Sequence, residues 1–107
     1  RHKTEEHFYV LLLTVKNKLI KPVLISKGGL TSSTAEQRAV FRQAIDANAA
    51  AIILMHNHPS GDPTESNDDV RVTKIFARAG EVMGIPVLDH IIIGDGIYVS
   101  LLEKGIL

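Results

Sequence analysis

Apolar and β-branched residues near the start of the chain predict a β-hairpin. Residues 8–15 are dense in side chains that favour strands, Lys16-Asn17-Lys18 interrupts them, and residues 19–26 resume the pattern. Pro22 cannot donate a hydrogen bond to a neighbouring strand. We therefore expect the second strand at a sheet edge, or with a bulge at the proline.

Two segments have the spacing of amphipathic helices. The first, about 35–47, follows two overlapping capping boxes, Ser33 with Glu36 and Thr34 with Gln37. Its expected apolar stripe consists of Val40, Phe41, Ala44 and Ile45. The second helix is predicted from about Ser66 to Gly84. Its apolar positions are Val72, Ile75, Phe76, Ala79, Val82 and Met83, and its outer face carries Arg71, Lys74 and Arg78.

A continuous apolar run at Ala49–Met55 predicts a central strand covered on both faces. This strand leads into a polar loop, residues 56–63. Pro86–Ile93 and 97–100 read as a further hairpin around the tight turn Gly94-Asp95-Gly96. The order ββαβαββ predicts an α+β fold, a mixed β-sheet flanked by helices.

Composition narrows the possible functions. The 107 residues are 45% apolar, which predicts one domain over 1–107 with a single modest core. The formal net charge is zero, so no global field gathers nucleic acid or an anionic membrane. Cysteine is absent, so any metal must be held by histidine and carboxylates, and a reducing, cytoplasmic location is expected.

The chain shows no signal peptide and no apolar run near the roughly 20 residues that cross a bilayer. We therefore expect no membrane association. The opening residues, Arg1-His2-Lys3-Thr4, read as a chain already under way. They suggest a fragment of a longer protein.

The polar loop after the central strand contains a candidate metal site. In an extended segment His56 and His58 project to the same side, and Pro59 favours extended geometry before it. The pair alone is a weak signal, because loop histidines are common without a ligand. Ser66 and Asp69 complete the spacing His-x-His-x7-Ser-x-x-Asp, for which an accidental match has a probability on the order of one in a thousand.

The carboxylate of this pattern can be assigned in two ways. Ser66 with Asp69 is also an N-cap with an acid at the third helical position, and that role can coexist with metal binding. Helical-wheel arithmetic places Asp68, not Asp69, nearer the middle of the apolar stripe. The motif spacing alone favours Asp69.

The segment from His56 to Pro63, with Ser66 and Asp69, resembles the JAMM motif of the bacterial RadC family, a JAB-type (MPN+) metalloprotease-like domain. The likeness covers nearly the whole chain and implies the JAB/MPN-like fold. Further similar positions are Glu6-His7-Phe8, residues 38–41, Asp89-His90 and residues 101–105. The chain departs from the family in lacking a preceding helix-hairpin-helix region and a proline just before Arg38.

The resemblance implies zinc (Zn2+) held by His56, His58 and Asp69, with water in the fourth position. It implies Glu6 as general base and Ser66 as support for the water or a developing oxyanion. Glu5 is the alternative to Glu6, and only the spacing to Phe8 favours the latter. Zinc with an open position and a nearby carboxylate suits hydrolysis of peptide or isopeptide bonds.

Other interpretations stay open. Asp89 and His90 are expected to have structural or hydrogen-bonding roles rather than direct ones. The family's association with DNA repair, with Arg71, Lys74 and Arg78, allows a metal-dependent DNA-processing module. A non-catalytic interaction module of the same fold is a third possibility. We expect a protein or peptide substrate, and at most weak nucleic-acid binding by this domain alone.

Overall fold

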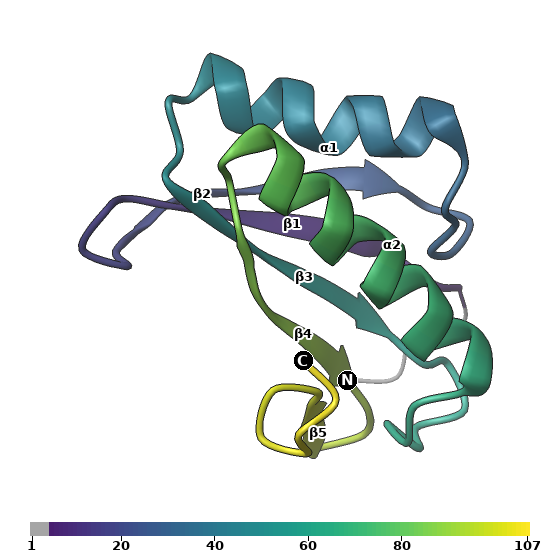
Figure 1. Ribbon diagram of the computed structural model, residues 1–107. Helices are drawn as coiled ribbons and strands as arrows, with labels where there is room; N and C mark the ends of the chain where they lie inside the picture. Colours follow the sequence, from purple (N-terminus) through teal and green to yellow (C-terminus); the bar gives the residue numbers. More distant parts are fainter. Residues whose placement is uncertain (1–4) are drawn as a thin grey trace.

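The computed structural model describes residues 5–107, and Figure 1 shows their arrangement. The elements follow the order ββαβαββ, which confirms the predicted α+β fold. They are β1 (Phe8–Leu13), β2 (Leu19–Ser26), α1 (Thr34–Asp46), β3 (Ala51–Asn57), α2 (Asn67–Met83), β4 (Val87–Ile93) and β5 (Tyr98–Ser100). In this part of the chain no helix is long and apolar enough to cross a membrane.

The strands form one mixed sheet in the order β2-β1-β3-β4-β5, with β3 at its centre as expected. β1 is antiparallel to β2 and β3, β3 is parallel to β4, and β4 is antiparallel to β5. Pro22 lies on β2, which is an edge strand of this sheet, as its missing N–H predicts.

The core lies between the sheet and the two helices. Phe8, Val10 and Leu12 of β1 and Ile52 and Leu54 of β3 have no solvent exposure. They form one cluster with residues of α1 and α2, because both helices cover the same face of the sheet (Figure 1). Ile53 and Met55, which alternate with them on β3, are only half-buried. The expectation that this strand is covered on both faces is therefore wrong for its second face.

The apolar stripes of the helices are narrower than predicted. Ile45 of α1 is 53% exposed, and in α2 Val82 is 83% and Met83 45% exposed. Gly80 is the last buried residue of α2, and Val82 lies about 200° further around the helix, on the solvent side. Ile45 lies next to the buried Ala44 but is turned about 100° away from it.

The start of α2 is fixed by a reciprocal capping box. The Ser66 hydroxyl accepts a hydrogen bond from the Asp69 backbone N–H (3.0 Å), and the Asp69 carboxylate accepts one from the Ser66 N–H (2.9 Å). Gly84 ends the helix in the left-handed conformation, with φ of 73°. The capping box holds the Asp69 side chain at the first turn, which faces the end of β3.

Candidate metal centre

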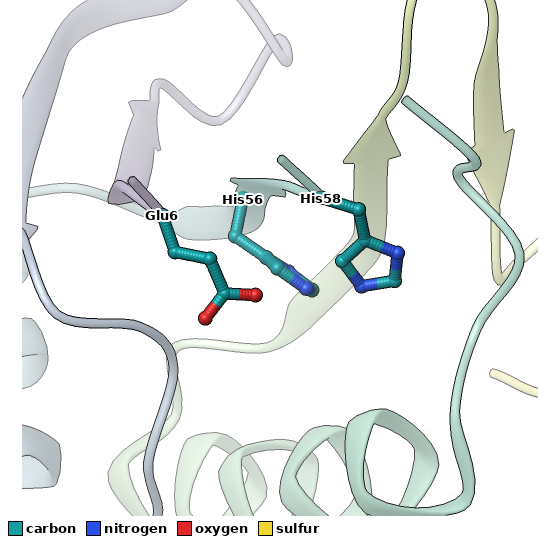
Figure 2. A group of neighbouring side chains, drawn as sticks. All are labelled: Glu6, His56 and His58. Carbon is teal, nitrogen blue, oxygen red and sulfur yellow. The ribbon is translucent and has the colours of Figure 1, made fainter. Parts of the chain in front are cut away.

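The antiparallel pairing of β1 with β3 brings two distant parts of the sequence together. Phe8 at the start of β1 lies opposite His56 near the end of β3. Glu6, two residues before Phe8, therefore lies beside His56 of β3 and His58, which follows the end of that strand. Figure 2 shows the side chains of Glu6, His56 and His58 pointing toward a common space.

These three side chains could share one metal ion. One ligand atom of each, a carboxylate oxygen or an imidazole nitrogen, lies within 4.8 Å of the others. His56 is buried, with 1% exposure, whereas Glu6 and His58 are half-buried. The group therefore lies at the edge of the core, where one side stays open to solvent.

Asp69 approaches the same two histidines from the first turn of α2. Its Oδ1 lies 3.4 Å from His56 Nε2, and its Oδ2 lies 3.1 Å from His58 Nε2. Atoms about 2.0–2.1 Å from a tetrahedral zinc lie roughly 3.3 Å from one another. The two separations match those expected of zinc ligands.

The hydrogen-bond partners of the rings indicate why a cation fits here. His58 Nδ1 is 3.0 Å from the carbonyl oxygen of Asp62, which can only accept a hydrogen bond, so Nδ1 carries the proton. In the neutral ring Nε2 then presents a lone pair to the Asp69 carboxylate. His56 Nε2 is buried and has no hydrogen-bond partner within residues 5–107. When both rings are neutral, electron-rich atoms converge here, and a bound cation would relieve their repulsion.

The electrostatics of Asp69 favour its charged form. Burial raises the pKa of this carboxyl, but the contact with His56 and the Ser66 N–H lower it more strongly, and both histidines lower it further when their rings are protonated. The net result is a pKa well below the ordinary value. Asp69 is therefore a carboxylate at neutral pH, the form that binds metal.

The neighbouring acids lie outside this cluster. The side chain of Asp68 is 65% exposed and pairs with Arg71 at 2.8 Å, so the wheel arithmetic that placed it nearer the apolar stripe was wrong. The cause is the helix start, because Ser66 as N-cap turns the third helical residue, Asp69, toward the sheet. The carboxylates of Asp62 and Glu65 bind Thr64 and Lys104 respectively.

Glu5 and Glu6 differ clearly in position. The Glu5 side chain is 59% exposed and lies 4.0 Å from His7 Nε2. Glu6 is half-buried and belongs to the group with the two histidines. The structure thus brings Glu6 and not Glu5 to the candidate site. Ser66 stands at the same site through its capping bonds with Asp69.

Sequence reasoning missed the part played by Asn57, the residue between the histidines. Its Oδ1 accepts a hydrogen bond from the His7 backbone N–H (2.7 Å), and its Nδ2 donates to the Glu5 carbonyl (3.2 Å). The side chain therefore holds the backbone on both sides of Glu6. Because Asn57 faces away from its two neighbours on an extended strand, only the pairing with β1 could have revealed this role.

His90 lies directly behind His56. Its Nε2 is 2.8 Å from His56 Nδ1, and its Nδ1 is 2.5 Å from the Thr73 hydroxyl. Burial and the nearby His56 ring lower the pKa of His90 to about 3, so the ring is neutral at neutral pH. Thr73 was not expected in any role, because the helical pattern makes it only a buried position of α2.

Asp89 makes hydrogen bonds that differ from those of the adjacent His90. Its carboxylate accepts hydrogen bonds from the Ser100 hydroxyl (2.6 Å) and the Leu102 backbone N–H (3.0 Å). It also accepts one from the His90 N–H (2.7 Å). Asp89 therefore joins β4 to the turn after β5 and takes no part in the cluster of ligand atoms.

The geometry agrees with what is found among known proteins. A family model described as the RadC-like JAB domain matches residues 1–106. The chain belongs to this family. The RadC resemblance expected from the motif is thereby confirmed, and with it the reading of the sheet and helices as a JAB-type fold.

Relatives of this RadC-like JAB domain carry the name UPF0758 protein. One from Pelobacter propionicus is 55% identical over 102 residues, covering 95% of this chain and 44% of the relative. One from Caldanaerobacter subterraneus subsp. tengcongensis is 55% identical over 105 residues, 98% of this chain and 45% of the relative. One from Geotalea uraniireducens is 50% identical over 107 residues. The chain spans less than half the length of these relatives.

Proposed function

We propose that this RadC-like JAB domain is a zinc-dependent hydrolase of peptide or isopeptide bonds. The observation that carries the proposal is the convergence of Glu6, His56 Nε2, His58 Nε2 and the Asp69 carboxylate on one half-buried position. Such a set supplies both metal ligands and a spare carboxylate, which a merely structural metal would not need.

The donor set supports zinc as the metal. Two imidazole nitrogens and a carboxylate are ligands that zinc accepts, and three protein ligands leave a position for water. Magnesium and calcium prefer sites made of oxygen ligands. Bound zinc would lower the pKa of a water molecule to roughly 7 and polarise a carbonyl group.

In the proposed reaction Glu6 is the general base. Its carboxylate lies beside the histidines rather than buried behind them, so it can take a proton from the attacking water and give it to the leaving amine. Asn57 holds the backbone on both sides of Glu6 and thereby keeps the carboxylate in place. His56, His58 and Asp69 would hold the metal.

Ser66 is proposed to support the oxyanion that develops on the substrate carbonyl. Its oxygen already accepts a hydrogen bond from the Asp69 N–H, so its hydroxyl proton is available to donate. A donor aimed at the developing charge stabilises the transition state more than the ground state.

The substrate is proposed to be a peptide or protein with an accessible amide bond. The DNA-processing alternative has less support, because Arg71 of the basic helix face is already paired with Asp68. Phosphodiester hydrolysis also tends to use carboxylate-rich or paired-metal sites.

The test combines metal analysis with turnover. Purified protein reconstituted with zinc should contain about one equivalent per chain, and it should release new amines from a mixed library of peptides and isopeptide-linked peptides. Glu6→Gln should keep the zinc and lose about 100-fold or more of the activity, because the amide keeps the size of the side chain but not its basicity. Glu5→Gln is the matched control and should remain active.

Three results would count against the proposal. Absence of zinc after reconstitution would contradict the proposed metal centre. Loss of activity in Glu5→Gln but not in Glu6→Gln would show that the general base is Glu5 rather than Glu6. Zinc without turnover on any peptide would favour the non-catalytic interaction module.

A further inference from the structure

A chain of buried hydrogen bonds leads away from the candidate ligand His56. It runs from His56 Nδ1 to His90 Nε2 (2.8 Å) and from His90 Nδ1 to the Thr73 hydroxyl (2.5 Å). From there it continues from the Thr73 hydroxyl to the backbone carbonyl of Asp69 (2.7 Å). His56, His90 and Thr73 are each at most 1% exposed. Water therefore does not replace any of these bonds.

The last bond of the chain sets the direction of all the others. Two oxygen atoms 2.7 Å apart need a hydrogen between them, and the Asp69 carbonyl has none, so the Thr73 hydroxyl donates. A hydroxyl has one hydrogen, so Thr73 must accept from His90 Nδ1–H.

The donor and acceptor roles fixed at Thr73 also fix those of the neutral His90 ring and of His56. With its single proton on Nδ1, His90 has a lone pair on Nε2 and must accept from His56 Nδ1–H. A neutral His56 ring then has its own lone pair on Nε2, the atom 3.4 Å from the Asp69 carboxylate.

We propose that Thr73 and His90 are positioning residues that hold His56 in the tautomer whose Nε2 lone pair faces the metal position. The metal in this statement rests on the proposed function, whereas the tautomer does not. The series of hydrogen bonds also ends close to where it begins. Asp69 accepts the Thr73 hydrogen bond at its backbone carbonyl, and its carboxylate lies beside His56. Residues of β3, β4 and α2 are thereby linked around the site.

The positioning of His56 matters because its other tautomer would also be stabilised, by the Asp69 carboxylate. If His56 carried its proton on Nε2, that N–H would point toward a negatively charged carboxylate, and the proton would have to be removed before metal could bind. The direction set by Thr73 opposes this state. His58 is fixed differently, by the backbone carbonyl of Asp62, and so provides an internal comparison.

The test replaces the hydroxyl without altering the ligands. Thr73→Val has nearly the same shape as the wild type but cannot accept from His90, whereas Thr73→Ser keeps the hydroxyl. Long-range 1H–15N NMR spectra of the metal-free protein report which nitrogen of each histidine is protonated, and competition with a chelator measures zinc affinity.

We expect both His56 and His58 to be protonated on Nδ1 in the wild type and in Thr73→Ser. In Thr73→Val the His56 signals should shift toward the Nε2-protonated form, while those of His58 stay unchanged. Zinc affinity should fall about 10- to 100-fold in Thr73→Val and stay near wild type in Thr73→Ser.

A second pair of variants tests His90 itself. The carbonyl of the side chain in His90→Gln can accept from His56 Nδ1–H, whereas His90→Leu cannot, so only the leucine variant should lose the Nδ1 tautomer and the zinc affinity. His56 protonated on Nε2 in the metal-free wild type would overturn the inference. So would wild-type zinc affinity in Thr73→Val. The expected tautomers without zinc binding would instead uphold the inference and count against the proposed function.

Discussion

At the scale of single residues, the site depends on which of two adjacent carboxylates faces the sheet. Asp69 is 9% exposed and touches both histidines, whereas Asp68 points outward to Arg71. Motif spacing selected Asp69, while the helical wheel selected Asp68. The helical wheel failed because it counts only the apolar positions of the helix. It cannot identify a carboxylate that is buried because it faces two histidines.

This pair of residues gives a direct test of the ligand set. Asp69→Asn should lose about 100-fold or more of the zinc affinity, because a neutral amide cannot replace the charge of a carboxylate ligand. Asp68→Asn should bind zinc as the wild type does, since its side chain faces solvent. Calorimetric titration of both variants measures the difference. Similar losses in the two would show that the ligand is misassigned.

The buried, neutral His90 should make the metal-free protein sensitive to acid. Its pKa is lowered from an ordinary value near 6.5 to about 3, so between these values the unfolded chain binds a proton that the folded chain does not. The free energy of unfolding is then fully retained above about pH 6.5 and falls as the pH drops toward 3, by up to about 1.4 kcal/mol per pH unit.

Urea unfolding of the metal-free protein at several pH values between 4 and 7 measures this slope. His90→Gln lacks the titrating ring, and its stability should change less steeply over the same range. Identical slopes for the two proteins would mean that His90 is not buried in its neutral form.

At the scale of elements, the site depends on the alignment of β1 with β3. The hydrophobic pattern predicted both strands, but β3 continues through His56 and Asn57, which were expected in the polar loop, so only His58 of the two histidines lies beyond the strand. The pattern did not reveal that the start of β1 lies against the end of β3, because strand pairing is set by contacts between distant segments. The placing of Glu6 next to His56 could therefore come only from the family resemblance, and the role of Asn57 from the structure.

The Asn57 side chain should control the position of the base. Asn57→Ala removes both hydrogen bonds to the backbone around Glu6. We expect turnover to fall about 10- to 100-fold, since small displacements of a catalytic group are costly. Zinc affinity should change only a few-fold, because the ligands belong to other side chains. Steady-state rates and metal analysis of the same samples measure turnover and zinc content. Loss of zinc in Asn57→Ala would contradict the view that Asn57 positions the base and not the metal ligands.

At the scale of the whole molecule, both helices lie on one face of a five-stranded sheet. Periodicity predicted the elements and their order, but it does not show on which face a helix packs. That is why the second face of β3 and the ends of both helices proved more exposed than expected. The site lies at one end of the sheet, where β1 begins and β3 ends, and the capping box of α2 completes it.

The overall charge predicts weak binding of nucleic acid by this domain. Twelve basic and twelve acidic residues leave no net charge, and Arg71 is already paired with an acid. Fluorescence anisotropy with labelled single-stranded and duplex DNA near physiological salt should give dissociation constants above about 10 μM, within the range of non-specific contacts. Sub-micromolar binding would contradict this prediction and favour the DNA-processing alternative.

The loop after β2 limits the space available to the Glu6 carboxylate. Gly29 is buried with φ of +105°, and a Cβ built at this position would lie 2.4 Å from Glu6 Oε1. A side chain there would have to displace the carboxylate, and the histidines lie beside it. If it moved toward them, Glu6 could become a fourth ligand and close the position that water needs. In the proposed hydrolase, the hydrogen atom that Gly29 has in place of a methyl group would therefore keep the fourth zinc position open to water.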